Sequence, residues 1–178
     1  MKQGVGSKSA TDLSNLNEAT NTGYYWKKMM DPKYANVGNS QNSAHFILFR
    51  YAEVLLGYAE AQNEVAAGDQ SAYDAFKRIR DRAQLVTPAI GTYTQETFRE
   101  AVWRERWHEL CYEGITWFDM VRLRKVYNET TNGFDNFVGH INKSSDEALQ
   151  EKHLLFPLGV QEMLNNPNLK PQNPGYPQ

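Results

Sequence analysis

The sequence predicts an all-α protein in which two antiparallel helix pairs follow a loop-rich N-terminal arm and precede an extended C-terminal tail. Three observations carry this prediction. Apolar residues recur at helical spacing between residues 50 and 125, with breaks at Gly68 and Gly114. Residues 1–43 are polar and irregular. Five of the seven prolines lie in the last 22 residues, and proline cannot continue a helix.

Length and composition narrow the possible functions. The chain has 178 residues, about one domain, with 19 basic and 21 acidic residues. This balance argues against a nucleic-acid-binding protein, which usually carries a basic patch. The single cysteine, Cys111, excludes an internal disulfide framework and a cysteine zinc site. Mean hydropathy is −0.68, and no apolar run approaches the ~18 residues of a membrane helix.

The N-terminal arm spans residues 1–43, and a single helical domain is expected over residues 44–178. Glycine, serine, asparagine and threonine dominate the arm, which is typical of loops. Residues 1–7 lead into no apolar signal core. Read alone, this start indicates a cytoplasmic protein, and a fragment whose export signal lies upstream has the same appearance.

The first helix pair is expected between Arg50 and Ala83. The first helix ends near Gly68, and its apolar stripe, interrupted by Gln62, consists of Tyr51, Val54, Leu55, Tyr58, Ala61 and Val65. The second helix follows at once, and one of its faces carries Ala72, Ala75, Phe76, Ile79 and Ala83. Because the connection is short, the two helices are expected to pack antiparallel.

The second pair follows a loop at Pro88 and Gly91. Thr94 alone, or Thr92 with Gln95, is expected to cap the third helix. Its apolar face, widened by Trp103 and Trp107, consists of Phe98, Ala101, Val102, Leu110 and Cys111. Gly114 ends it, and the fourth helix carries Trp117, Phe118, Val121 and Leu123.

After Lys125 the helical pattern is lost. Residues 154–157 form a short apolar run that we interpret as a strand or a buried extended segment. A brief helix is expected from Val160 to Leu164, followed by the extended, proline-rich tail. The turn formed by residues 173–176 is expected to place Tyr176 on the helices.

Glu105 and His108 form an E-x-x-H pair, the spacing that di-iron helical bundles use. Such a site needs a second E-x-x-H, which the sequence lacks. The favoured interpretation is a surface helix on which Glu100 pairs with Arg104. Cys111 is interpreted as a small buried hydrophobic residue, slow to react, and not as a nucleophile. We therefore expect no catalytic residues, no bound metal and no cofactor.

Arg78, Arg80 and Arg82 spread around the second helix and form no single patch. We interpret them as structural side chains that hold carboxylates or loop carbonyls. Their candidate partners are Glu53, Glu60 and Glu113.

Tyr24, Tyr25 and Trp26 lie outside the periodic helices and are the candidate carbohydrate-binding residues. Their rings can stack on sugar faces, or they can anchor the arm on the helices. If the segment is extended, Tyr24 and Trp26 share one face and Tyr25 lies on the other. Polar side chains that would add hydrogen bonds to a sugar are Asn39, Gln41 and Asn42.

Four sequence blocks resemble the SusD/RagB family. Residues 50–63 contain R-Y-A-E-V-L-L and Y-A-E-A-x-N, and residues 75–83 read A-F-K-R-I-R-D-R-A. Residues 105–122 resemble the family pattern E-R-x-x-E-L-x-x-E-G-x-R-W-F-D-L-V-R. Residues 154–176 are similar to its closing L-L-x-P-I-P-x-x-E-x-x-x-N-P-x-L-x-Q-N-P-G-Y. The order of the blocks makes the match specific.

Three departures leave the core of these patterns intact. Thr116 stands where the family usually has arginine, Leu158 and Gly159 replace Ile-Pro, and residues 170–171 add a residue before Gln172. A larger departure is length, because family members are usually far longer and the match covers their C-terminal portion. This difference predicts a fragment or a truncated gene.

The resemblance implies tetratricopeptide-like helices and a surface-exposed outer-membrane lipoprotein that captures glycans or other nutrients. Its implied partners are a SusC-like TonB-dependent transporter and an oligo- or polysaccharide, with no nucleic acid. The recognised blocks are then mainly scaffold. Two alternatives stay open: a tetratricopeptide-like interaction scaffold without ligand binding, and an enzyme in which Glu105 and His108 cluster and point inward.

Overall fold

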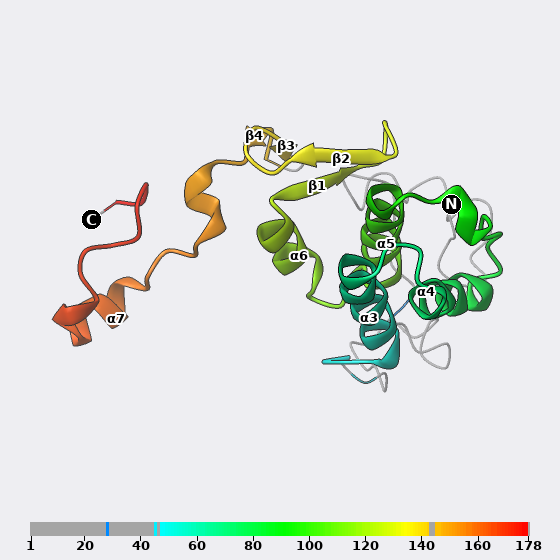
Figure 1. Ribbon diagram of the computed structural model, residues 1–178. Helices are drawn as coiled ribbons and strands as arrows, with labels where there is room; N and C mark the ends of the chain where they lie inside the picture. The colour runs from blue at the N-terminus through cyan, green and yellow to red at the C-terminus, as the bar shows by residue number, and fades with distance from the viewer. Residues whose placement is uncertain (1–27, 29–44, 46, 143–144, 178) are drawn as a thin grey trace, which may run out of the picture. The chain divides into compact units, whose positions relative to one another are not determined.

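The computed structural model describes residues 28, 45, 47–142 and 145–177 (Figure 1). The chain divides into two compact units, Met1–Leu48 and Phe49–Gln178. All helices and strands among the described residues belong to the second unit. The boundary expected between residues 43 and 44 lies outside the described residues.

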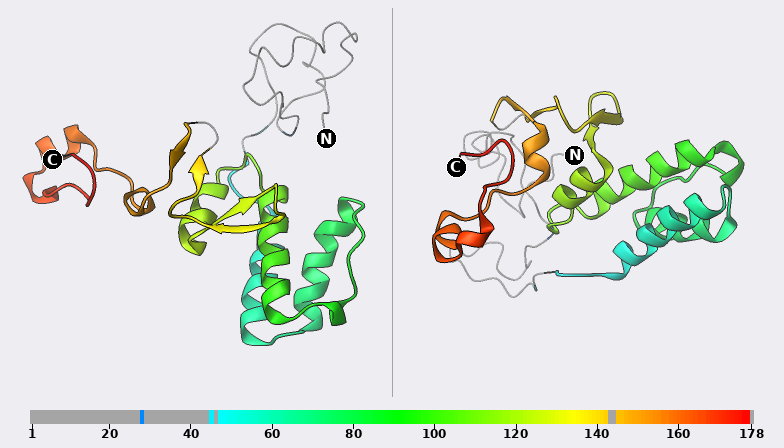
Figure 2. Two further views of the ribbon diagram at one scale, coloured as in Figure 1. Left: turned by 90° about the horizontal axis from the view of Figure 1, so that it is seen from above. Right: turned by 60° about the vertical axis from the view of Figure 1, so that its left-hand side comes forward.

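Four helices occupy the region between residues 50 and 125, as the sequence predicts. They are α3 (Tyr51–Val65), α4 (Gln70–Arg82), α5 (Gln95–Glu109) and α6 (Thr116–Leu123). Helix α3 packs extensively against both α4 and α5, as the views in Figure 2 show, whereas the main packing contact of α6 is with strand β1. Helices α5 and α6 therefore make few contacts with each other and do not form the second antiparallel pair as predicted. The helical core consists of α3, α4 and α5.

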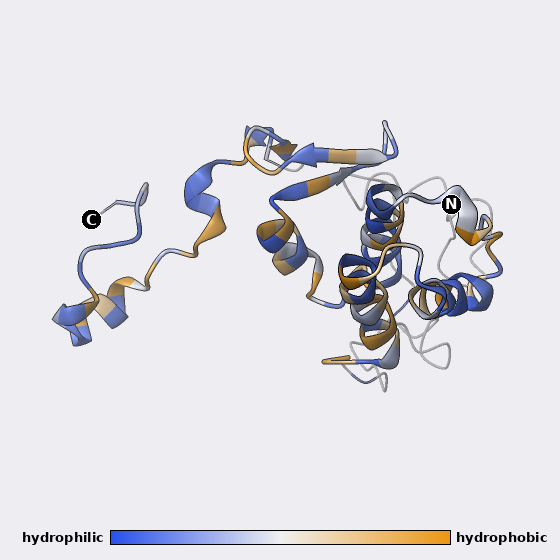
Figure 3. Cartoon of the chain, viewed as in Figure 1, coloured by the Kyte–Doolittle hydropathy of each residue, from blue (hydrophilic) through white to orange (hydrophobic). Residues whose placement is uncertain are grey.

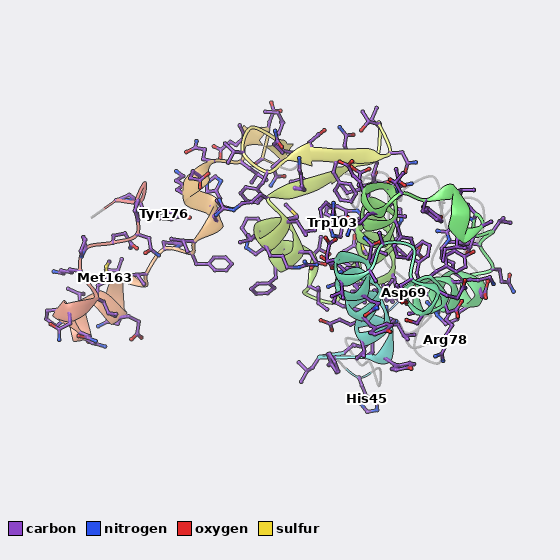
Figure 4. The ribbon with its side chains drawn as sticks, in the orientation of Figure 1. His45, Asp69, Arg78, Trp103, Met163 and Tyr176 are labelled. Carbon is purple, nitrogen blue, oxygen red and sulfur yellow. The ribbon has the colours of Figure 1, made fainter. Side chains whose placement is uncertain are left out.

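Local chemistry explains where these helices begin and end. Asp69 caps α4, because its carboxylate accepts hydrogen bonds from the backbone N–H groups of Ser71 and Ala72, and Figure 4 shows Asp69 at the start of that helix. Thr94 caps α5 in a reciprocal arrangement with Thr97, which confirms one of the two predicted caps. Gly114, with φ of +80°, terminates the segment before α6.

The buried face of α3 differs from the predicted stripe. Small residues and one leucine are buried on it: Ala52, Leu56, Ala59 and Asn63. Most of the predicted stripe is exposed instead, namely Tyr51, Val54, Tyr58, Ala61 and Val65, with Leu55 partly buried. Alanines let the backbones of α4 and α5 approach α3 closely, while the Tyr58 hydroxyl lies 2.7 Å from the Ser71 hydroxyl of α4.

The predicted apolar face of α4 is confirmed at four of its positions, namely Ala72, Ala75, Phe76 and Ile79. Ala83 is exposed and lies beyond the end of the helix. The Phe76 ring meets that of Phe98 on α5 edge to face, with centroids 5.3 Å apart. Tyr93 closes the same aromatic cluster at 5.4 Å from Phe98.

Two antiparallel hairpins correct the all-α prediction. Strand β1 (Lys125–Asn128) pairs with β2 (Gly133–Asn136), and β3 (Ile141–Asn142) pairs with β4 (Glu147–Ala148). Hydrophobic residues sit between hydrophilic ones along β1 and β2 (Figure 3). These hairpins form a second core of Val126, Phe137 and Leu149, against which Trp107 and Trp117 pack.

The C-terminal segment contains two 3-10 helices, η3 (Glu151–Leu154) and η4 (Pro167–Leu169), and the predicted brief helix α7 (Val160–Asn165). Residues 155–158 are not a strand, and Leu155 and Phe156 are exposed. The tail folds onto this stretch: the Gln172 amide pairs with both backbone groups of Leu158 at 2.7 and 2.9 Å.

Tyr176 lies elsewhere than predicted. Its hydroxyl group donates to the Leu155 carbonyl at 2.9 Å, so Tyr176 packs on the preceding segment and not on the long helices.

Helices long and apolar enough to cross a membrane are absent from the part of the chain that the structure describes.

Candidate functional site

The charged residues of the recognised motifs are largely bound to one another. Arg50, just before α3, donates to the Glu113 carboxylate at 2.6 Å and to the Glu109 carboxylate at 2.5 Å. Arg82 on α4 reaches the same Glu109 carboxylate at 2.6 Å. These contacts tie the start of α3 and the end of α4 to the end of α5.

A second set of ion pairs joins α3, α5 and α6. Arg106 is buried and donates to Asp119 at 2.8 and 3.1 Å. Arg122 bridges Asp119 to Glu60, which it binds through both nitrogens at 2.6 and 2.7 Å. Hydrogen bonding to Glu60 raises the pKa of the Arg122 guanidinium above its usual value. The Trp103 indole also donates to Glu60, so this carboxylate is fully engaged.

The arginines of α4 have the predicted structural role but different partners. Arg80 donates to Glu105 at 2.7 Å and to the Val86 carbonyl at 2.8 Å. Arg78, labelled in Figure 4, lies over the Tyr51 ring with its guanidinium carbon 5.4 Å from the centroid. The predicted partners Glu60 and Glu113 bind Arg122 and Arg50 instead.

Glu105 and His108 do not form a cluster of catalytic type. Glu105 is buried and neutralised by Arg80, whereas His108 is exposed and meets the Tyr127 ring edge-on at 5.2 Å. Within the ranges described, no three His, Cys, Asp or Glu side chains gather in a way that could hold a metal ion. The inward cluster that an enzyme would need is therefore contradicted at Glu105 and His108.

Two further sequence expectations concern Cys111 and the aromatic arm. Cys111 follows α5 in a turn and is only partly buried, so it is not a member of the buried helical stripe. Tyr24, Tyr25 and Trp26 lie outside the described residues, as do Asn39, Gln41 and Asn42.

A cavity of about 1070 Å³ lies between α5, α6 and the hairpins. We call it the aromatic cavity. Trp107, Trp117 and Tyr127 contribute rings to its wall. Polar side chains complete the lining, among them Asn128, Asp135, Asn136 and His140.

The rings of the aromatic cavity are held in place by packing. Trp107 lies 5.8 Å from Tyr127, and Trp117 lies 5.8 Å from Phe137, measured between ring centroids. Neither indole N–H donates a hydrogen bond to any residue in the described part of the chain, in contrast to Trp103. Both tryptophans are only partly buried. The cavity thus offers fixed aromatic surface and uncommitted donors.

Its polar groups are positioned by the first hairpin. Asp135 on β2 accepts from the Asn128 amide on β1 at 2.9 Å and lies 3.1 Å from the His140 ring nitrogen Nδ1. Asn136 accepts from Lys125 at 2.8 Å, which leaves its amide N–H₂ group available. Lining carboxylates come from Glu129, Asp135 and Asp146, whereas none of the arginines or lysines that the structure describes lines the cavity.

Sequence reasoning missed this site for a physical reason. Its residues come from α5, α6 and three short strands, so they share no spacing in the chain. The tryptophans were recognised only as packing residues. Their free indole groups depend on hairpins that the helical pattern could not reveal.

Comparisons with known proteins agree on one family. A family model described as the SusD family matches residues 1–176. "SusD-like protein P2" and "SusD-like protein P38" of Formosa agariphila are 35% identical over 158 residues and 29% identical over 148 residues. These matches cover 81% and 79% of this chain, but only 29% and 26% of the relatives.

A solved structure shows the same relationship. A SusD superfamily protein from Parabacteroides distasonis ATCC 8503 superposes with a TM-score of 0.72 at 35% identity, covering 82% of this chain and 30% of that one. The chain thus spans less than a third of the length of each of these relatives. Together with the four motif blocks, these matches confirm the predicted resemblance, and the chain belongs to the SusD family.

Proposed function

We propose that this protein is a non-enzymatic glycan- or nutrient-binding component of a SusC–SusD type uptake system in the outer membrane. In this proposal it is exposed at the cell surface as part of a lipoprotein, and its partner is a SusC-like TonB-dependent transporter. Family membership supports the class of function. The aromatic cavity supports a place for the ligand within this chain.

The single observation that carries the proposal is the pairing of Trp107 and Trp117 with polar side chains in one cavity. Binding sites for small molecules are concave, mostly apolar and furnished with a few placed polar groups. The C–H face of a sugar ring packs on an indole ring, while Asn136 and Asp135 offer groups to its hydroxyls. Tyr24, Tyr25 and Trp26 remain proposed as further sugar contacts from the N-terminal arm.

The contacts of the motif carboxylates support a role in binding without catalysis. Glu60, Glu105, Glu109 and Glu113 are all held by arginines. A carboxylate engaged by a guanidinium is a poor general base, because its charged form is already stabilised. This arrangement supports binding without turnover.

The test uses calorimetric titration of the 178-residue chain with neutral oligosaccharides of several linkages. We expect saturable binding, and we expect Trp107→Ala to weaken it about tenfold or more, since a stacked ring and an indole donor are lost. Trp103→Phe is the matched control, because Trp103 lies one turn away on α5 and does not line the cavity. Its affinity should match that of the unmodified chain, with folding of both variants verified by circular dichroism.

Unchanged affinity in Trp107→Ala would remove the aromatic cavity as the ligand site. The proposal would then turn to the arm, and Trp26→Ala is the variant that tests it. Absence of binding to every glycan would favour the second candidate function.

That second candidate is a tetratricopeptide-like interaction scaffold, and one observation favours it. The outer face of α3 exposes large apolar side chains, namely Tyr51, Val54, Tyr58 and Val65. Exposed apolar patches often mark surfaces that bind other proteins. Under this function the unmodified chain binds no glycan, and Val54→Lys abolishes its capture of a SusC-like partner.

A further inference from the structure

A second cavity, of about 610 Å³, lies between α4, the loop before α5 and a different face of α5. We call it the arginine cavity. Arg104 and His108 reach it from successive turns of α5, and Arg80 reaches it from α4. The rings of Phe76 and Tyr93 also contribute to its lining.

Arg104 makes no hydrogen bond and no ion pair in the part of the chain that the structure describes. Its Nε atom is shielded from solvent and makes no hydrogen bond there. The pairing with Glu100 that the sequence suggests does not form. A shielded guanidinium nitrogen without an acceptor is an unusual feature of a folded protein and calls for one, such as a bound anion.

Two other donors line the same cavity without a hydrogen-bond partner among the described residues. These are the Tyr93 hydroxyl and the His108 imidazole. The Tyr93 hydroxyl is protonated and able to donate at neutral pH, as for any tyrosine with the ordinary pKa of 10.0, and burial raises this pKa further. Three different donor groups therefore border one space.

The acidic residue of this cavity is already neutralised. Glu105 accepts from Arg80 at 2.7 Å, and the other Arg80 nitrogens are engaged by Thr87 at 3.2 Å and the Val86 carbonyl at 2.8 Å. Arg80 and Glu105 cancel in charge. No other side chain that lines this cavity balances the positive charge of Arg104, so the cavity favours an anion.

We propose that the arginine cavity binds an oxyanion group, a carboxylate or a sulfate, carried by a saccharide, with Arg104 as its anchor. A guanidinium matches such groups because its planar fork can donate two parallel hydrogen bonds. Tyr93 and His108 supply the remaining donors. The saccharide part rests on the proposed function, whereas the oxyanion part stands on these contacts alone.

The test is an NMR titration of the 178-residue chain, with the His108 ring signals as reporters. The probes are sodium glucuronate and sodium sulfate at constant ionic strength, with glucose as the neutral comparison. We expect saturable shifts with at least one anion and none with glucose. Saturation by glucuronate alone identifies a carboxylate ligand, and saturation by sulfate alone identifies a sulfate ligand.

Bound anion should also raise the pKa of His108. In the structure this pKa is lowered chiefly by partial desolvation of the ring, with Glu105 and Glu129 opposing and Arg104 and Arg80 adding to the decrease. An anion beside the imidazole favours its charged form, so the titration curve of His108 should move to higher pH.

Two arginine variants on α5 test whether Arg104 anchors the anion. Arg104→Gln should weaken anion binding at least tenfold, whereas Arg99→Gln should leave it unchanged, because Arg99 binds Glu64 and does not line the cavity. Equal affinity in Arg104→Gln, or no saturable shift with either anion, would overturn the proposal. Titration of neutral oligosaccharides with Trp107→Ala tests the aromatic cavity separately, so failure of one site is distinguishable from failure of the other.

Discussion

Trp103 and Trp107 lie four residues apart on α5 and meet two different environments. Trp103 donates to Glu60, a carboxylate that Arg122 also holds, and so belongs to the ion pairs that join α3, α5 and α6. Trp107 lines the aromatic cavity, and its indole N–H reaches no acceptor among the residues described. One turn of helix thus separates a side chain used for structure from one available to a ligand.

This difference separates family recognition from ligand recognition. The charged motif residues that identify the family form ion pairs with other motif residues. Arg106 pairs with Asp119, and Glu109 pairs with Arg50. A buried guanidinium needs such partners, because an unpaired charge is costly away from water. The polar residues of the aromatic cavity lie in the hairpin region, outside the motif blocks, whereas its two tryptophans, Trp107 and Trp117, lie within the block of residues 105–122.

The strongest way to break the comparison is to remove a motif charge. Arg106→Ala should lower the free energy of unfolding by about 1–3 kcal/mol, because the poorly exposed Asp119 loses two hydrogen bonds and keeps only its ion pair with Arg122. Urea unfolding measures this change. Arg99→Ala is the control, since its pair with Glu64 is more exposed, and it should cost about 1 kcal/mol or less. Equal losses in both variants would show that the motif charges are not the main scaffold.

A smaller effect is expected at the glycine that precedes α6. Gly114 has φ of +80°, and a residue with a Cβ atom pays about 1–2 kcal/mol in that region. Gly114→Ala should therefore be destabilising by about that amount although nothing lies near the added atom.

The matched control has the opposite sign. Gly57 lies within α3 and has open space around its Cβ position, so Gly57→Ala should stabilise the protein by about 0.5–1 kcal/mol. Thermal unfolding of both variants checks the pair. A destabilising Gly57→Ala would indicate that the outer face of α3 is covered in solution.

The exposed ion pair of Glu64 and Arg99 should show a weak pH dependence. Hydrogen bonds from Arg99 lower the pKa of Glu64 below its usual 4.5. Because the folded pKa is the lower one, the stabilisation is present above about pH 4.5 and is lost as the pH falls through the folded value. Solvent screening limits it to about 0.2–1 kcal/mol. Glu64→Gln should therefore be less stable than the unmodified chain by about this amount at pH 7 and equally stable at pH 3, as measured by urea unfolding at both pH values.

The sequence predicts the helices well where local chemistry is decisive. Gly68, Thr94 and Gly114 mark helix ends through backbone freedom or capping, and the alternation of apolar and charged residues on α4 leaves only one face to bury. Helix α3 is different, because alanines and larger apolar residues surround most of it. Periodicity then cannot tell which face is buried, and tertiary packing selects Ala52 and Ala59.

The hairpins and the candidate site could not be predicted from local patterns. The strands are two to four residues long, too short for a clear alternation of apolar and polar positions. The turn between β1 and β2 includes Asn132-Gly133, a dipeptide typical of hairpins, but four residues separate the strands instead of the two of a tight turn, which weakens this signal. Ion-pair partners were also beyond reach, because Arg50 and Glu113 lie 63 residues apart and meet only in the folded chain.

Asn136→Ala sharpens the comparison most finely, because it separates structure from binding in a single residue. Asn136 is exposed at the end of β2 and contributes one acceptor to Lys125. Its removal should change the free energy of unfolding by no more than about 0.5 kcal/mol, as for most surface substitutions. The same change removes an amide from the aromatic cavity, and one lost hydrogen bond of about 0.5–1.5 kcal/mol corresponds to roughly 2- to 13-fold weaker glycan binding. Calorimetry and urea unfolding on one preparation measure both quantities. Loss of stability with intact binding would show that Asn136 has a structural role. The first hairpin would then belong to the scaffold, and the polar side of the aromatic cavity would not be the part that contacts the ligand.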